Sequence, residues 1–376
     1  MISNLFNNKL TIEVGRTRAA GYAAKLMSDA GSDVITIQDV GREKNMTSYA
    51  RMYMDTGKDV ITWNAETDTI LATKVLPHAN AFITDLPQSE LKKRGLDFER
   101  VHAIAPKLNY VSLTPTGWGD DQEQIQGELS MQALSGLMYM VGHQDREPLA
   151  LPYGIGAVQL GLQGAAAITA AIYETEINGR GHYIEISGTQ VLASYVRIYG
   201  AVASYYDIQL RREGRRAPGS GGRYPFGLFP CKDGYVAMIC RSDREWQSLL
   251  QMMGNPEWSK QDRYLDLYAI AIEYPEEIDE LIRPWLMNHT RDELLELAQK
   301  YAVPVAPVRN VKEVTEDKQL LYRSFFDQLT TKNGRVVQIP GRPWASVSRE
   351  LQEFSPQDTA NLIRKIDVVG VNVRND

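Results

Sequence analysis

A stretch of small and apolar residues, residues 151–187, places the strongest constraint on how this chain of 376 residues can fold. Residues 158–176 are mainly Ala, Gly, Leu, Ile, Thr and Gln, and charge appears only in the last turn, which is typical of a helix buried on most sides. Asn178 and Gly179 then predict the end of the helix, and residues 182–186 alternate like a strand. With so little side-chain bulk, another helix or a ligand can approach the backbone of this helix closely.

The first half of the chain alternates strand-like and helix-like segments. Residues 10–14 and 33–37 predict strands, and residues 19–30 between them predict a helix, so the three form a strand–helix–strand unit. The further expected strands are residues 59–63, 81–84 and 110–113. This order predicts a Rossmann-like α/β domain with a parallel sheet. The loop at residues 15–21 lacks the G-x-G-x-x-G dinucleotide fingerprint, which disfavours a nicotinamide enzyme.

A smaller α+β domain is expected in the second half of the chain. Residues 206–225 are rich in Arg and Gly and predict a linker or loop. After them, two strands around a Lys-Asp-Gly turn precede three amphipathic helices. The predicted boundaries are residues 1–205 and 342–376 for a large discontinuous domain, 206–225 for the linker, 226–330 for the small domain and 331–341 for the return connection.

The composition disfavours several classes of function. A net charge of -6 and a pI near 5.6 argue against a nucleic-acid surface, since phosphate binding needs a local excess of Lys and Arg. The N-terminus has no basic start and no long apolar run, and no stretch approaches the length of an apolar membrane span, so we expect a cytoplasmic protein. Cys231 and Cys240 suggest neither a disulfide framework nor a metal cluster, and we expect no metal.

Several motifs along the chain resemble those of the family III CoA-transferases, the family of formyl-CoA transferase, carnitine CoA-transferase and the α-methylacyl-CoA racemases. The central match is the small-residue helix, followed by Asn-Gly-Arg-Gly at residues 178–181 and an Ile-Glu-Ile strand. The other matching segments are residues 112–119, 131–138, 229–236, 246–254, 291–294 and 303–308. The resemblance extends over most of the chain, and the order of the segments makes it specific.

The resemblance implies a fold, a partner and a substrate. Members of this family have a large discontinuous α/β domain and a small α+β domain, and two subunits thread through each other as an interlocked dimer. We therefore expect a tight dimer of this chain, either with itself or with a homologous subunit. The expected ligands are coenzyme A, its acyl thioesters and carboxylic acids, and we expect no nucleic acid and no membrane as partner.

The resemblance also implies where coenzyme A binds. Ligands of parallel sheets lie beyond the carboxyl ends of the strands, near helix N-termini that favour anions. Arg16, Arg18 and Ala19 follow the first strand, where the family holds the pantetheine and pyrophosphate of CoA. Lys58 and Lys93 fall at two further places where the family has a basic residue near CoA phosphate. The alternative interpretation of the two arginines is a solvated pair at a helix start.

One departure from the family pattern concerns the catalytic residue. The resemblance implies a catalytic Asp four residues before Gly161, the first glycine of the small-residue helix, and this chain has Ala157 there. In the family, the Asp attacks the acyl-CoA thioester and forms covalent intermediates. Alanine has no nucleophile, so we name no catalytic residue. Asp145 and Glu147, the nearest preceding carboxylates, lie in a polar segment ahead of Pro152 and are interpreted as solvated.

Two polar loops are expected beside the pocket. Residues 116–126 are rich in Gly, Asp and Gln, and together with Glu128 we interpret their carboxylates as a solvated loop, since they lack calcium-loop spacing. In the family, a glycine-rich loop closes over the site, which makes Gly219, Gly221 and Gly222 candidates for that loop. A plain interdomain linker is the alternative.

Three functions fit a retained fold with a missing Asp. The first is a subunit of a heteromeric CoA-transferase, as in succinyl-CoA:benzylsuccinate CoA-transferase, that depends on a homologous Asp-bearing chain and is inactive alone. The second is an active homodimeric CoA-transferase or acyl-CoA racemase with a relocated catalytic residue. Ala157 counts against the racemase as well, because the racemases of the family need a carboxylate at the same position. The third is a non-catalytic CoA-binding protein, and the sequence favours the first.

Overall fold

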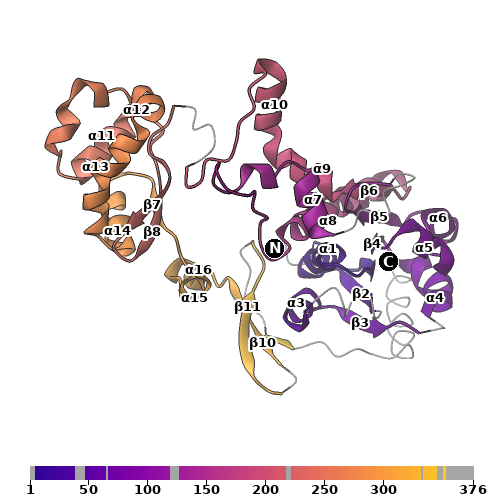
Figure 1. The fold of residues 1–376 in the computed structure, drawn as a ribbon. Helices are drawn as coiled ribbons and strands as arrows, with labels where there is room; N and C mark the ends of the chain where they lie inside the picture. Colours follow the sequence, from indigo (N-terminus) through magenta and orange to yellow (C-terminus); the bar gives the residue numbers. More distant parts are fainter. Residues whose placement is uncertain are drawn as a thin grey trace. The chain divides into compact units, whose positions relative to one another are not determined.

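The computed structural model describes residues 5–38, 47–64, 67–118, 127–216, 222–331, 333–344 and the backbone of 350–352 (Figure 1). The chain forms two compact units. Unit 1 comprises residues 1–137, 151–196 and 317–376, and unit 2 comprises residues 138–150 and 197–316. The domain boundaries expected from the sequence stay a prediction, and most of the expected final segment, residues 342–376, lies outside the described residues.

A six-stranded parallel sheet is the centre of unit 1. Its strands, in the order in which they pair, are β3 (Asp59–Thr62), β2 (Asp33–Gln38), β1 (Leu10–Val14), β4 (Ala81–Thr84), β5 (Asn109–Thr114) and β6 (Tyr183–Ser187). Every residue of β1, β4 and β5 is buried, as expected for a parallel sheet covered on both faces. The strand order changes direction between β1 and β4, and the Rossmann-like sheet expected from the sequence is confirmed.

Helices and a second sheet complete unit 1 (Figure 1). The helices are α1 (Arg18–Asp29), α3 (Ser48–Met54), α4 (Thr67–Ile70), η2 (Leu71–Val75), η3 (Leu76–His78), α5 (Gln88–Arg94), α6 (Phe98–Ile104), α7 (Glu128–Leu134), α8 (Ile155–Asn178), α9 (Gly188–Ala193), η6 (Ser194–Val196) and α16 (Lys318–Tyr322). The second sheet has the order β11 (Val336–Pro340), β10 (Phe326–Thr330), β12 (Glu350–Gln352). Trp344 packs against the core that α1 and α8 share, so the chain returns to this core near its C-terminal end.

Helix α8 packs closely against α1, and its glycines make this possible. A Cβ at Gly161 would lie 2.5 Å from the carbonyl oxygen of Ala19 on α1, nearer than a side chain can approach a backbone. A Cβ at Gly164 would lie 3.0 Å from Leu113 of β5. The helix ends at Gly179, which takes the left-handed conformation with φ of 70°. The close backbone approach predicted for this helix is therefore confirmed, and it holds α8 against both α1 and β5.

By length and composition, α8 is apolar enough to cross a membrane, contrary to the expectation that no stretch approaches a span. Its 24 residues include a window of mean hydropathy 1.5, and 50% of that window is buried inside the structure. A core helix of a globular protein has the same properties, and α8 has the contacts of a core helix. This helix is therefore weak evidence for a membrane.

Unit 2 is an α+β arrangement around a three-stranded antiparallel sheet. Its strands pair in the order β7 (Phe226–Cys231), β8 (Gly234–Ile239), β9 (Val305–Pro307). Its helices are η5 (Met138–Met140), α10 (Arg197–Tyr206), α11 (Asp243–Met252), η7 (Glu257–Lys260), η8 (Asp262–Tyr264), α12 (Leu267–Glu273), α13 (Pro275–Met287), α14 (Arg291–Tyr301) and α15 (Val311–Thr315). Trp246 and Tyr264 are fully buried at the centre of its core, with the indole nitrogen of Trp246 donating to the Tyr264 carbonyl oxygen at 3.1 Å.

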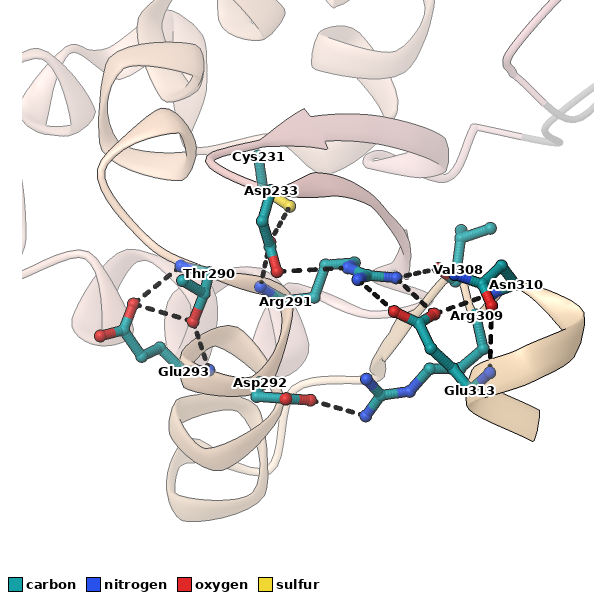
Figure 2. Close-up of polar contacts among 10 residues, drawn as sticks. All are labelled: Cys231, Asp233, Thr290, Arg291, Asp292, Glu293, Val308, Arg309, Asn310 and Glu313. Atoms are coloured by element: carbon teal, nitrogen blue, oxygen red, sulfur yellow. Dashed lines mark hydrogen bonds and ion pairs between the residues drawn. The ribbon is translucent and has the colours of Figure 1, made fainter. Parts of the chain in front are cut away.

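Arg291, at the start of α14, joins three elements of unit 2 (Figure 2). Its guanidinium donates to both oxygens of Glu313 on α15, at 2.7 and 3.0 Å, and to the carbonyl oxygen of Val308 after β9, at 2.7 Å. Its backbone N–H donates to Asp233 in the β7–β8 turn at 2.8 Å. Hydrogen bonds from Arg291 and from the Asn310 backbone lower the pKa of Glu313 to about 2. The ion pair therefore holds the turn, α14 and α15 together.

We predict that this network makes stability depend on pH in acid. The pKa of Glu313 falls from its ordinary 4.5 to about 2 on folding, so its contribution is fully present above the ordinary value and is lost as the pH falls toward 2. In Arg291→Gln, the urea midpoint measured from about pH 5 to about pH 2 should fall less steeply than in the wild type. Arg283→Gln, which removes an exposed pair with Glu280 on α13, is the control and should keep the wild-type slope. Equal slopes in all three proteins would contradict the assignment.

A buried ion pair lies beneath α1. The Lys58 ammonium donates to Glu13 of β1 at 2.7 Å and to the carbonyl oxygen of Gly21 at 2.8 Å, and both charged side chains are fully buried. The hydroxyl of Thr36 on β2 donates to the same Glu13 oxygen at 2.6 Å. Charges with no access to water persist in a core when they are paired and hydrogen-bonded, as here. Lys58 therefore links α1 to β1 of the sheet through these two contacts.

We expect Lys58→Met to lower the free energy of unfolding by about 3–5 kcal/mol, because it leaves the Glu13 carboxylate buried without its cation. Glu13→Gln combined with Lys58→Met should recover part of the loss, since it removes the unpaired charge. Urea unfolding of the three proteins measures both effects. Lys93→Met, at an exposed position on α5, is the matched control and should change stability by less than about 0.5 kcal/mol. A Lys58→Met protein as stable as this control would show that the pair is unimportant.

Candidate functional site

A cavity of about 420 Å³ lies in unit 1 beyond the carboxyl ends of β1, β4 and β5. This is the point where the strand order reverses, and open α/β sheets bind ligands at such points. Its described lining comprises residues 17–19, Asp85, Pro87, residues 113–118, Gly127, Glu128, Met131, Ala157 and Leu160. The wall is therefore apolar for the most part, with charged groups at a few places.

A carboxylate already occupies the N-terminus of α1. Asp85, just after β4, accepts from the backbone N–H groups of Arg16 and Thr17, at 2.7 and 2.9 Å, and from the Thr17 hydroxyl at 2.6 Å. Burial raises the pKa of Asp85, against the effect of these hydrogen bonds. The N–H groups that a pyrophosphate would use in a dinucleotide fold are thus bonded within the chain.

Glu128 occupies the N-terminus of α8 in the same way. Its carboxylate accepts from the backbone N–H groups of Gly156 and Ala157, at 2.7 and 2.8 Å, and from the Gln132 side-chain amide at 2.6 Å. The first N–H groups of a long helix lack partners within the helix, and the helix dipole favours an anion there. The interpretation of Glu128 as part of a solvated loop is therefore wrong, because its carboxylate belongs to the cavity wall beside Ala157.

No local sequence signal pointed to Glu128. It lies 28 residues before Gly156 and 29 before Ala157, and the segment between them has no regular pattern that would bring the two together. One indirect sign exists in the sequence. Gly156 has no side chain, and a Cβ there would lie 2.8 Å from the Glu128 carboxylate, so the glycine leaves room for it.

Arg18 reaches from α1 to the start of α8. Its guanidinium donates to the carbonyl oxygen of Tyr153 at 3.3 Å and lies against Gly154, where a Cβ would overlap it. Tyr153 has the left-handed φ of 60°, which is uncommon for a residue other than glycine. Ala19, the next residue on α1, is buried and lines the same cavity. Arg18 and Ala19 are thus the two predicted CoA-binding residues that the structure brings into the cavity.

The other three predicted CoA-binding residues lie elsewhere in unit 1. Arg16 makes a two-point ion pair with Glu90 of α5, at 2.6 and 2.5 Å, and hydrogen bonds from Arg16 and Arg94 outweigh burial and lower the pKa of Glu90. Lys58 is buried in its pair with Glu13, and Lys93 is exposed on α5. None of the three is among the described residues that line the cavity, and their assignment to CoA stays a prediction.

The remaining candidates fall in unit 2 or outside the described residues. Asp145 and Glu147 are exposed in unit 2. Gly222 has a left-handed φ of 77° and lies against the ring of Tyr268. Among the residues that the structure describes, no group of three or more His, Cys, Asp or Glu side chains has the arrangement of a metal site. The candidates that lie outside the described residues are Asp120, Asp121, Glu123, Gly219 and Gly221.

Known proteins are similar to this chain in sequence over most of its length and in fold. Two relatives are a succinate–glutarate CoA-transferase of Agrobacterium fabrum, 22% identical over 88% of this chain and 86% of the relative, and the alpha subunit of a succinyl-CoA–L-malate CoA-transferase of Chloroflexus aurantiacus, 24% identical over 88% and 80%. The crystal structure of a CaiB/BaiF family protein from Brucella suis matches the fold with a TM-score of 0.81 at 22% identity, over 96% of this chain and 99% of that one.

The whole-chain comparison with family models identifies the family. The model described as CoA-transferase family III matches residues 8–357, which include the six-stranded sheet, the cavity and all of unit 2. The chain therefore belongs to CoA-transferase family III.

Proposed function

We propose that this chain is a subunit of a CoA-transferase that moves CoA between carboxylic acids and depends on a homologous subunit for the catalytic Asp. The observation that carries the proposal is Ala157, whose methyl group lies in the cavity wall at the start of α8, where the resemblance places the Asp. The cavity itself is retained, with Arg18 and Ala19 in its wall. A retained pocket without its nucleophile is what a non-catalytic partner subunit would have.

The missing carboxylate removes the covalent route of the reaction. In a catalytic subunit, an Asp oxygen attacks the thioester carbonyl carbon, the carbon–sulfur bond breaks, and CoA leaves as a thiolate while an acyl anhydride forms. CoA thiolate then attacks the Asp carbonyl and releases the first acid. Ala157 can accept no acyl group, so this chain alone would need both acids and CoA bound at once. We therefore infer that the chain is inactive without its partner.

Exposed apolar faces on each unit support a partner subunit. On α8, Leu162, Tyr173 and Ile177 are 43%, 69% and 65% exposed. Helix α10, all of which the structure describes, has no buried residue, and its Tyr205 is 85% exposed. Apolar faces of this kind mark contact surfaces. The relative named as an alpha subunit and the family resemblance support a heteromer or an interlocked dimer as the assembly.

A second candidate function depends on the position of Glu128 beside Ala157 in the cavity wall. Its carboxylate lies on the N–H groups of Gly156 and Ala157, at the helix start where the nucleophile is expected, so an active homodimeric CoA-transferase could use Glu128 in its place. An acyl-CoA racemase would need a carboxylate at the same place. The third candidate, a CoA-binding protein without chemistry, is supported by the retained cavity alone.

Chemical trapping separates these functions. We expect the purified chain, incubated with acyl-CoA and then with hydroxylamine or borohydride, to show no mass shift on any carboxylate peptide, because Ala157 offers no nucleophile. A shift on Glu128 that disappears in Glu128→Gln would establish the relocated nucleophile and overturn the subunit proposal. Asp145 and Glu147, exposed in unit 2, are internal controls for nonspecific labelling. Acyl-CoA binding without turnover or any partner would favour the third candidate.

We also predict that the chain does not remain a monomer. Light scattering at low micromolar concentration should give at least twice the chain mass of 42.3 kDa, because the exposed faces of α8 and α10 need a partner. Purification from the native host, with mass spectrometry of the bound chain, should identify a homologue with Asp at the position of Ala157. A stable monomer near 42.3 kDa would contradict the expected dimer.

A further inference from the structure

We propose that the cavity selects acyl groups that carry a second carboxylate, and that Arg18 is the residue that pairs with it. This inference rests on the proposed function only in taking the cavity as the acyl-CoA pocket. It assigns Arg18 to the acyl group, whereas the sequence resemblance assigned it to a CoA phosphate. The predicted substrate class is a short dicarboxylic acid and its CoA thioester.

The first observation is the charge of the cavity wall. Among the described residues that line the cavity, Arg18 is the one cation. The two carboxylates of the wall, Asp85 and Glu128, each accept backbone N–H groups at a helix start, and these groups offset part of their negative charge. A neutral acyl chain would need no cation in this wall. A carboxylate would, because it loses its hydration on entering the cavity.

The second observation is the hydrogen bonding of Arg18. A guanidinium has five N–H donors in a planar fork that fits a carboxylate. In the part of the chain that the structure describes, Arg18 makes one long hydrogen bond, to the Tyr153 carbonyl oxygen at 3.3 Å, and no ion pair. Arg16 differs, since its guanidinium is already paired with Glu90 at two points. Arg18 is therefore the arginine at this sheet edge with capacity for an anionic ligand.

The third observation is the position of Arg18 relative to the reacting end. Its guanidinium lies against Gly154, and Ala157 lies three residues later on α8. Three residues of an α-helix rise about 4.5 Å, which is comparable to the length of an acyl group of about four carbons. Leu113, Met131 and Leu160 line the space as apolar contacts for the intervening carbons. A thioester carbonyl near Ala157 would thus place a distal carboxylate within reach of Arg18.

The test compares succinyl-CoA with butyryl-CoA, which have the same chain length and differ in a terminal carboxylate or methyl group. Calorimetry on the full-length chain, with any subunit that purifies with it, should show succinyl-CoA binding about tenfold more tightly. Arg18→Met should abolish this preference while changing butyryl-CoA affinity by less than about twofold. Arg18→Lys keeps the charge and should keep part of the preference. Arg16→Met is the matched control and should keep all of it, because Arg16 is not among the described lining residues.

Each other outcome overturns the inference. Equal affinities of the wild type for succinyl-CoA and butyryl-CoA would show that the cavity does not bind a second carboxylate selectively. A similar loss for both thioesters in Arg18→Met would place Arg18 on the CoA phosphates. No binding of either thioester would remove the premise that the cavity holds acyl-CoA. Failure of the proposed function would be a separate result. Turnover by the chain alone, or trapping on Glu128, would overturn the proposal of a non-catalytic subunit. The preference for succinyl-CoA over butyryl-CoA would be unaffected by that outcome.

Discussion

The close backbone contact between α1 and α8 is the constraint on which the site depends. Gly161 permits it, since a Cβ there would collide with the Ala19 carbonyl oxygen on α1. The contact brings the N-terminus of α1 and that of α8 to the same edge of the sheet, at its topological switch point. The cavity is the space left between these two helix starts and the ends of β4 and β5. The small residues of α8 thus set the position of the two helix starts that form the cavity wall, and the polar residues of the site depend on that position.

Each of the two helix starts is neutralised by a carboxylate of the chain itself. Asp85 bonds the N–H groups at α1, and Glu128 bonds those at α8. Helix N-termini otherwise attract anionic ligands, so these two residues leave the cavity with less intrinsic attraction for phosphate than the fold would offer. The positive charge that remains in the described wall is Arg18, which is why our proposal assigns an anionic group in this cavity to that side chain.

The fold could be predicted from the sequence because its strands and helices follow from the local spacing of apolar residues and from composition. The strands around Ile12 and Val111 are short and rich in apolar and β-branched residues, and the small-residue helix ends at Gly179, so period and composition were sufficient. The site was harder to predict. Glu128 meets Ala157 across 29 residues, which no periodicity encodes, and the resemblance placed Lys58 near CoA phosphate, whereas the structure buries it against Glu13. Glu13, a charged residue within the apolar strand Leu-Thr-Ile-Glu-Val, was the available sign that a buried cation was needed.

The hydrogen bonds of Glu128 bear on whether it can replace the missing nucleophile. Three N–H groups donate to its two oxygens, from Gly156, Ala157 and Gln132. Three of its about four lone-pair sites are thus engaged, which holds the carboxylate against the start of α8 and makes its oxygens weaker nucleophiles. An anchored carboxylate stabilises the start of α8, whereas a nucleophile needs a lone pair directed into the cavity. The observed geometry is that of the anchor, and it favours a chain whose fold is maintained while the chemistry resides in a partner.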